Sequence, residues 1–107
     1  MAAATREVRR ELGLPVSLHR LLVVDWVAPR EGASIEGLLF VYDAPTLSHE
    51  QIDAISVPTD ELEGCAWCDD RQLRERLPAH MLRRITAALR ARTDGETLYL
   101  ENGSITN

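Results

Sequence analysis

The sequence contains no lysine, and its 12 basic residues are all arginines, set against 17 acidic residues. The arginines alternate with acidic residues instead of forming a block, and the formal net charge is -5 with a pI near 5.1. A surface that binds nucleic acid needs a basic patch to neutralise phosphates. The composition therefore predicts that nucleic acid is not a partner.

Long hydrophobic runs are also missing. No apolar stretch approaches the roughly 20 residues that a helix needs to cross a bilayer. No basic start followed by an apolar segment resembles a signal peptide. We therefore expect no membrane partner and a cytoplasmic location. With 107 residues, 45% of them apolar, the chain has room for one domain over 1–107 with a modest core.

Cysteine occurs only twice, as Cys65 and Cys68 in a Cys-x-x-Cys spacing. This spacing could serve redox chemistry or supply half of a zinc site. A structural zinc site takes about four ligands, however, and the three histidines are scattered singly along the chain. We favour a structural interpretation in which 65–68 form a short strand, with Trp67 packed inside the fold or on its rim.

The first part of the chain predicts a helix followed by a hairpin. A helix is expected over 2–12, because apolar side chains recur one turn apart and Gly13 and Pro15 end the pattern. Two apolar runs rich in branched and aromatic residues, 18–27 and 35–43, have the length and composition of strands. The Gly- and Pro-containing segment between them predicts a β-hairpin.

The middle of the chain is punctuated by turn residues. A turn-rich loop is expected over 43–48, a short strand over 55–58 and a helical turn over 59–63. Asp69 is predicted to cap the next short helix, with Gln72 completing a capping box.

The last part of the chain predicts a longer helix over 78–92, closed by Asp94 and Gly95. A terminal strand with a turn is expected over 98–103. The helix is expected to bury one aliphatic stripe, formed by Leu82, Ile85 and Leu89. Its basic side chains are expected to face water: Arg83, Arg84, Arg90 and Arg92.

The first predicted helix carries a charged face that suggests metal chemistry. At about 100° per residue, Glu7 and Glu11 share one face with Arg10 beside them. Two carboxylates one turn apart repel each other by a few tenths of a kcal/mol, so a compensating cation is expected. An arginine would serve, and so would a hard divalent ion such as Mg²⁺, which takes oxygen ligands and retains water and phosphate oxygens. A divalent ion bound in this way is typical of phosphoryl or pyrophosphoryl transfer.

The run REVRRELGL, residues 6–14, resembles the second half of the Nudix box. That half reads Arg-Glu, a hydrophobic residue, any residue, Glu-Glu, any residue, Gly and a hydrophobic residue. The order that follows is also similar to Nudix hydrolases: a hairpin, an ELEGCAW segment, a DxxQL helix and a final helix. The resemblance covers nearly the whole chain, and it implies an α/β (α+β) fold, a partial Nudix-type α/β/α sandwich with a mixed sheet.

The resemblance also implies an activity. Nudix hydrolases cleave nucleoside diphosphates linked to another moiety, with Mg²⁺ or Mn²⁺ held by box glutamates, so a small-molecule nucleoside diphosphate derivative is the implied partner. By position, Glu7 would bind the metal or orient its water, Glu11 would be a metal ligand, and Arg6 would brace them as a buried salt-bridge partner. Glu61 matches the place of an additional catalytic glutamate in some members. Gly13 would have a backbone role.

The sequence departs from the box in two ways. Arg10 stands where the first of the paired glutamates is expected, which places a positive charge close to the implied metal. Only five residues precede Arg6, so the first half of the box and the strands before it are missing. We therefore expect a Nudix-like domain over 1–107 that is N-terminally truncated relative to the family. A homodimer could replace the missing strands, or the chain could be a fragment of a longer enzyme.

An ordinary amphipathic helix is the competing interpretation. Arg6 and Arg10 repeat at the same spacing as Glu7 and Glu11, so mutual pairing on a solvated face explains the charges without metal. Two functional hypotheses remain open from the sequence. The chain is either a metal-dependent pyrophosphohydrolase or a non-catalytic Nudix-like domain that binds a ligand or dimerises through an unpaired sheet edge.

Overall fold

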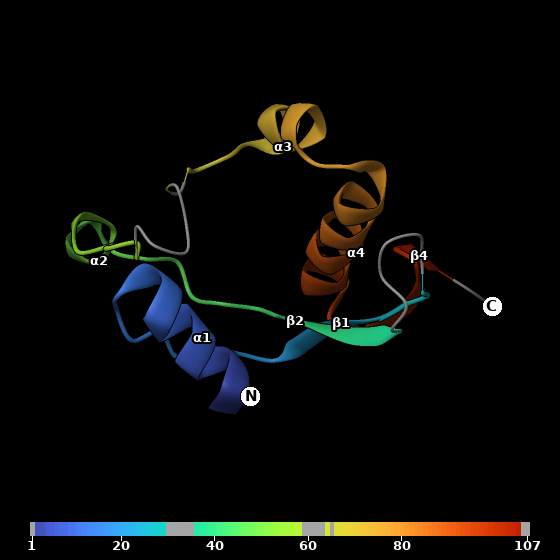
Figure 1. Cartoon of the computed structure of the whole chain (residues 1–107), viewed down its shortest axis with the longest axis horizontal. Helices are drawn as coiled ribbons and strands as arrows, with labels where there is room; N and C mark the ends of the chain where they lie inside the picture. Colours follow the sequence, from blue (N-terminus) through green and yellow to red (C-terminus); the bar gives the residue numbers. More distant parts are fainter. Residues whose placement is uncertain (1, 30–35, 59–63, 65, 106–107) are drawn as a thin grey trace. The chain divides into compact units, whose positions relative to one another are not determined.

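The helices and strands of the described residues follow one another along the chain in the order α1, β1, β2, α2, α3, α4, β3, β4 (Figure 1). The computed structural model describes residues 2–29, 36–58, 64 and 66–105.

These elements divide into two units, each built from two separate stretches of chain. The unit that contains α1, here the α1 unit, comprises Met1–His19 and Ala44–Trp67. The unit that contains the sheet, here the sheet unit, comprises Arg20–Asp43 and Cys68–Asn107. The expected single domain over 1–107 stays a prediction.

The described residues of the sheet unit form one mixed sheet of four strands in the order β2-β1-β3-β4. β1 pairs antiparallel with β2 and parallel with β3, and β3 pairs antiparallel with β4. The predicted hairpin is confirmed, although its strands are shorter than the predicted ranges of 18–27 and 35–43. The chain has an α+β fold with a mixed sheet. The strands are β1 Leu21–Val27, β2 Gly37–Tyr42, β3 Leu98–Glu101 and β4 Ser104–Ile105.

The predicted terminal strand over 98–103 is confirmed in part, because the chain turns at its end and pairs back as β4. Asn102 and Gly103 both have positive φ, 49° and 80°, the backbone that a two-residue hairpin turn of type I′ requires. A Cβ atom at Gly103 would lie 2.6 Å from the carbonyl oxygen of His80. Glycine is therefore required at this turn both for its φ and for its close approach to α4.

Two helices of the sheet unit have the predicted caps. α3 spans Asp70–Arg76, and Asp69 and Gln72 form the expected capping box, each side chain accepting from the other's backbone N–H at 2.9 Å. α4 spans Ala79–Asp94 and ends at Gly95, whose φ of 72° is left-handed. Both helix predictions are confirmed.

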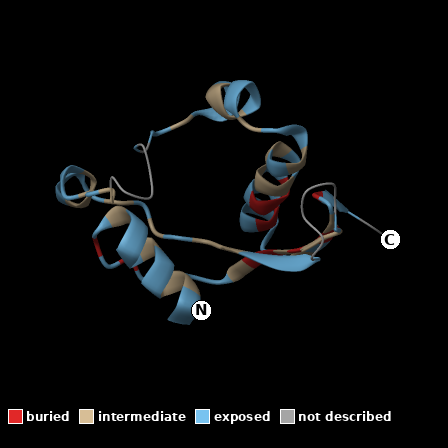
Figure 2. Ribbon diagram, in the orientation of Figure 1, coloured by how far each residue is buried: buried red, intermediate tan, exposed pale blue. Residues whose placement is uncertain are grey.

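The stripe of α4 that packs on the sheet is not the predicted one. Ala87, Ala88 and Ala91 are buried, and they pack against Leu22, Val23 and Leu100 of the sheet (Figure 2). Leu89, predicted to be buried, is 44% exposed, and Leu82 and Ile85 are only half-buried. The prediction was wrong because alanines let a helix approach a sheet closely, and the flanking leucines then lie outside the closest contact.

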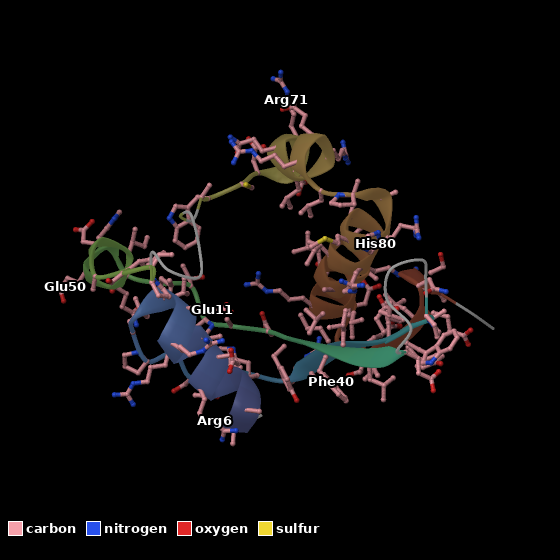
Figure 3. The ribbon with its side chains drawn as sticks, in the orientation of Figure 1. Arg6, Glu11, Phe40, Glu50, Arg71 and His80 are labelled. Carbon is pink, nitrogen blue, oxygen red and sulfur yellow. The ribbon has the colours of Figure 1, made fainter. Side chains whose placement is uncertain are left out.

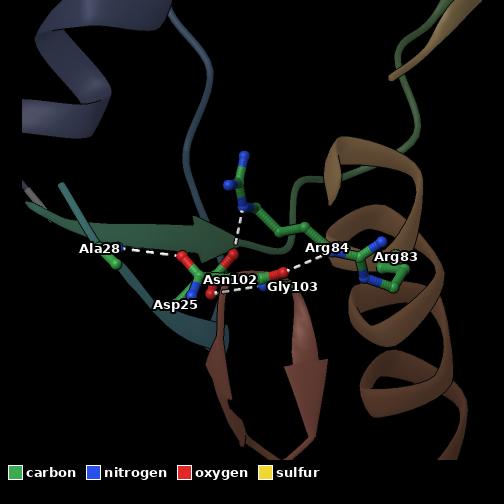
Figure 4. A network of polar contacts seen from close by, with 6 residues as sticks. All are labelled: Asp25, Ala28, Arg83, Arg84, Asn102 and Gly103. Atoms are coloured by element: carbon green, nitrogen blue, oxygen red, sulfur yellow. Dashed lines mark hydrogen bonds and ion pairs between the residues drawn. The ribbon is translucent and has the colours of Figure 1, made fainter. Parts of the chain in front are cut away.

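The buried stripe of α4 also contains Arg84, which the sequence predicted to face water. Its side chain is 11% exposed, and its Nε lies 2.7 Å from Oδ2 of Asp25 (Figure 4). Asp25 lies in β1 and is 0% exposed; its Oδ1 accepts a hydrogen bond of 3.0 Å from the backbone N–H of Gly103. A buried charge is tolerated when it is paired and hydrogen-bonded, and both oxygens of this carboxylate have partners.

The turn between β3 and β4 is held by three further hydrogen bonds around Asn102, and Figure 4 draws those with Ala28 and Arg83. Its backbone N–H donates to the carbonyl of Trp26 at 2.8 Å, and its Oδ1 accepts from the backbone N–H of Ala28 at 3.0 Å. Arg83 of α4 donates to its carbonyl at 2.8 Å. The turn therefore connects the end of β1 to α4.

The α1 unit contains α1 Ala2–Leu12, as predicted, and α2 His49–Asp53, which the sequence analysis missed. α2 follows the predicted loop over 43–48 and begins at a capping box of Ser48 and Gln51. No described residue over 55–58 is in a strand, so that prediction was wrong. The backbone N–H of Ser56 instead donates to the carbonyl of Leu12 at 2.7 Å, so this segment is hydrogen-bonded to the end of α1.

The predicted strand over 65–68 is also wrong for its described residues, 66–68, which are irregular. Trp67 is 64% exposed and is not packed inside the fold. Cys65 and the predicted helical turn over 59–63 lie outside the described residues.

The ion pair between Asp25 and Arg84 predicts a large loss of stability when one partner is removed. Arg84→Ala leaves the buried carboxylate without its cation, which costs about 3–5 kcal/mol. Arg90→Ala is the matched control, because Arg90 pairs with Asp94 on the exposed side of the same helix at 3.6 Å and should cost roughly 0–1 kcal/mol. Urea unfolding of the sheet unit, followed by Trp26 fluorescence in a Trp67→Phe background, measures both. Equal losses in the two variants would contradict this account.

Candidate functional site

The two candidate metal ligands lie on the solvent-facing surface of α1. Glu7 and Glu11 are both exposed and lie one turn apart, and Figure 3 shows Glu11 and Arg6 on this helix. Nη2 of Arg10 lies 2.5 Å from Oε2 of Glu7. Arg10 is thus paired with one of the two carboxylates on this face. An exposed pair of this kind contributes about 0–1 kcal/mol, so a competing cation can separate it at low cost.

Arg6 is exposed, which contradicts the expectation of a buried salt-bridge partner. The physical reason is that α1 has no buried residue at all. An arginine on such a helix stays hydrated, and it holds neighbouring carboxylates only weakly. In this structure Arg10, not Arg6, is the arginine that contacts Glu7.

The other predicted residue of the site, Glu61, lies outside the described residues. Among the residues that are described, no group of three or more His, Cys, Asp or Glu side chains could hold a metal ion. Glu7 and Glu11 therefore stand as a pair of carboxylates without a third described ligand.

Gly13 ends α1 and is required there for two separate reasons. Its φ is 72°, and its backbone N–H donates to the carbonyl of Arg9 at 2.9 Å. A Cβ atom would lie 2.9 Å from the carbonyl oxygen of Ser56 and 3.1 Å from its Cβ. The expected backbone role of Gly13 is confirmed, because it lets the 44–67 stretch approach the helix end.

Each unit has a hollow among its described residues, but only that of the sheet unit has the volume of a ligand pocket. In the α1 unit, Leu12, Ile55, Ala66 and Trp67 line a hollow of about 180 Å³, below the roughly 300 Å³ at which ligand pockets begin. A hollow of about 440 Å³ in the sheet unit is lined from α4 and the β3–β4 hairpin. Its lining includes Arg83 and Arg90 but no described carboxylate or histidine, so it offers no general base.

The pKa of the Tyr99 phenol is raised above its ordinary value of 10.0. Partial desolvation by neighbouring groups is the main cause, and the negative charge of Glu101 is the next. The Tyr99 hydroxyl lies 3.5 Å from Oε1 of Glu101. Tyr99 is therefore a neutral hydrogen-bond donor near pH 7 and supplies no phenolate nucleophile.

No helix in the described part of the chain combines the length and the apolar character that a bilayer crossing needs. No family model matches the sequence, and no curated protein or solved structure is significantly similar to it.

Two features of the structure were visible in the sequence but not used. Asp25 is the one charge within LLVVDWV, an apolar strand, which signals a buried carboxylate that needs a partner. Arg84 falls on the same helical stripe as the buried alanines of α4, at the spacing i, i+3, i+4 and i+7. Combining these two signals would have predicted the ion pair.

The dual requirement for Gly13 predicts a difference between two glycine substitutions. Gly13→Ala introduces a left-handed alanine and a clash with Ser56, whereas Gly95→Ala introduces the same φ of 72° with no heavy atom within 4 Å. We expect Gly95→Ala to destabilise the sheet unit by about 1–2 kcal/mol and Gly13→Ala to destabilise the α1 unit by more. Urea unfolding, followed by Trp26 for the sheet unit and Trp67 for the α1 unit in single-tryptophan backgrounds, measures both. A smaller loss for Gly13→Ala would show that the contact with Ser56 is unimportant.

Proposed function

We propose that the chain is a Nudix-type, metal-dependent hydrolase of nucleoside diphosphates linked to another moiety, acting on the pyrophosphate bond. One observation carries the proposal: Glu7 and Glu11 are exposed, one turn apart, on a helix that ends at the tightly packed Gly13. This is the arrangement of carboxylates and glycine that the resemblance of 6–14 implies. The likeness in element order supports the same proposal.

The carboxylates fit Mg²⁺ or Mn²⁺ in a particular way. Mg²⁺ is commonly held by one or two carboxylates, with water and substrate phosphate oxygens completing its shell. Two exposed glutamates can supply this share, so the ion would bind together with the diphosphate rather than in a protein cage. When bound, it neutralises phosphate charge and lowers the pKa of water.

The chain's own residues have separate proposed roles in holding the metal, accepting a proton and binding phosphate. Glu11, which is exposed on the same face, would hold the metal. Glu7 would give up its contact with Arg10 to hold the metal or to orient the attacking water, and it would accept the proton of that water. Arg10, once released, can donate to phosphate oxygens, which its planar guanidinium matches in pairs. Arg6 remains a nearby hydrated cation, and Glu61 is retained as the proposed additional catalytic glutamate.

A second candidate function follows from the contact between Arg10 and Glu7. Because that contact occupies one of the two carboxylates, the chain could bind a nucleoside diphosphate derivative through its arginines without hydrolysing it. This non-catalytic domain differs from the hydrolase in one measurable respect, since its ligand binding would need no divalent metal.

Removal of the proposed metal ligand tests the hydrolase. Glu11→Gln should lower phosphate release from a panel of nucleoside diphosphate derivatives, with Mg²⁺ or Mn²⁺, by at least about 100-fold, because several kcal/mol of charge stabilisation is lost. Glu50→Gln is the matched control, an exposed glutamate on α2 of the same unit, and should leave turnover unchanged. Metal-dependent turnover that survives Glu11→Gln would refute the assignment.

Restoration of the paired glutamates tests the cost of Arg10. Arg10→Glu removes the cation that competes for Glu7 and adds a third carboxylate to the face, so Mn²⁺ affinity should rise by about 10-fold or more. Arg9→Glu makes the same charge change at the neighbouring exposed position and controls for net charge. Mn²⁺ titration followed by electron paramagnetic resonance compares the two variants with the wild type. Equal gains in both variants would mean that general electrostatics, not a site at Glu7 and Glu11, attracts the ion.

A further inference from the structure

β2 is an edge strand without the usual protection against pairing. It lies at one end of the described sheet, next to β1 alone. Its sequence, GLLFVY, has no charged residue and no proline. Natural edge strands commonly carry charges, prolines or bulges that prevent association with another strand. Among the described strands, only β1 pairs with β2, so the other edge of β2 can form backbone hydrogen bonds with a further strand.

The exposed side chains of β2 are all hydrophobic and lie together. Leu38 is 55% exposed, Leu39 43% and Phe40 53%, whereas the last two residues of the strand are half-buried. Figure 3 labels Phe40 on this strand. The exposed set is thus symmetrical about Leu39.

These three side chains lie on both faces of the sheet. Leu39 is paired with Asp25 and shares the face on which Arg84 of α4 reaches that carboxylate. Phe40 is paired with Val24 and lies on the opposite face. Leu38 shares that opposite face, because side chains alternate along a strand.

We propose that β2 pairs edge to edge with β2 of a second copy of this chain, in antiparallel register about a twofold axis at Leu39. An axis perpendicular to the sheet reverses strand direction and keeps each face continuous across the junction. Leu38 then lies opposite Phe40 of the partner subunit, and Leu39 lies opposite Leu39 of the partner subunit. The two sheets become one.

The strand is complementary to itself in this register. Each exposed hydrophobic side chain meets another on the same face, and cross-strand pairs of this kind stabilise a sheet. Glu36, the acidic residue just before β2, falls opposite Tyr42 of the partner subunit, so no like charges meet there. A register centred one residue further on would place the exposed Leu38 opposite the half-buried Tyr42 of the partner subunit. The distribution of exposure therefore favours the axis at Leu39.

The area involved indicates a reversible dimer. A half-exposed phenylalanine offers about 100 Å², so the three side chains together offer a few hundred Å² per copy. A standard interface buries about 800 Å² per partner. Backbone hydrogen bonds along the edge add to this small apolar contact, as in other cases of strand addition. We expect a dissociation constant on the order of 10 μM.

The test uses two oppositely charged double variants of the full chain. Leu38→Lys with Phe40→Lys, and Leu38→Glu with Phe40→Glu, each place like charges opposite one another across the axis. Each variant alone should sediment as a monomer at concentrations where the wild type is dimeric, at roughly 100 μM. In an equimolar mixture opposite charges meet at the same positions, so heterodimers should form. Recovery in the mixture also shows that both variants are folded.

Leu89→Lys is the matched control, because it replaces a comparably exposed leucine on α4 and should leave the wild-type dimer intact. Three results would overturn the proposal: a wild type that is monomeric throughout this range, double variants that still self-associate, or a mixture that does not form heterodimers.

Discussion

The buried carboxylate of Asp25 is the interaction on which the arrangement of the sheet unit depends. Its partners come from positions 59 and 78 residues further along the chain, Arg84 of α4 and the N–H of Gly103. Desolvation of a charge is expensive unless pairing and hydrogen bonding compensate for it. Strand β1, helix α4 and the β3–β4 turn must therefore all be in place before this residue is satisfied. Hydrophobic packing alone would tolerate other placements of an alanine-faced helix, so the ion pair adds specificity of position.

The charges of the candidate site, in contrast to Asp25, are exposed and weakly paired. Glu7, Arg10 and Glu11 lie on a helix with no buried residue, where charges are hydrated and each pair is weak. Weak pairing suits the exchange of Arg10 for a bound metal ion that we propose for this surface. The close packing of the α1 unit is instead at the backbone of Gly13, where Ser56 approaches too closely for any side chain. A defined helix end next to an exposed charged face is compatible with the proposed ligand, which would bring part of its own metal shell.

Local signals predicted local structure well. Capping residues and glycines predicted α1, α3 and α4. Two apolar runs separated by a Gly- and Pro-containing segment predicted the hairpin of β1 and β2. The helix α2 was missed although Ser48 and Gln51 repeat the pattern used for Asp69 and Gln72. The errors concern contacts between distant segments: which stripe of α4 packs on the sheet, where Arg84 points, and what Ser56 contacts. Side-chain volumes and pairing between distant segments determine these contacts. The periodicity of a single segment does not predict them. For the site, the sequence placed Glu7 and Glu11 together, but the competition from Arg10 became specific only with the 2.5 Å contact.

The parallel pairing of β1 with β3 has a consequence for the order of folding. Val23 is in register with Leu98, so the sheet cannot gain its third strand until the residues of β3 have been synthesised, more than 70 positions after those of β1. Until then the hairpin has two strands, an aspartate without its cation and an apolar surface without its helix. High contact order of this kind slows folding and prolongs exposure of strand edges during synthesis. The late arrival of β3 is thus a consequence of the topology of this sheet.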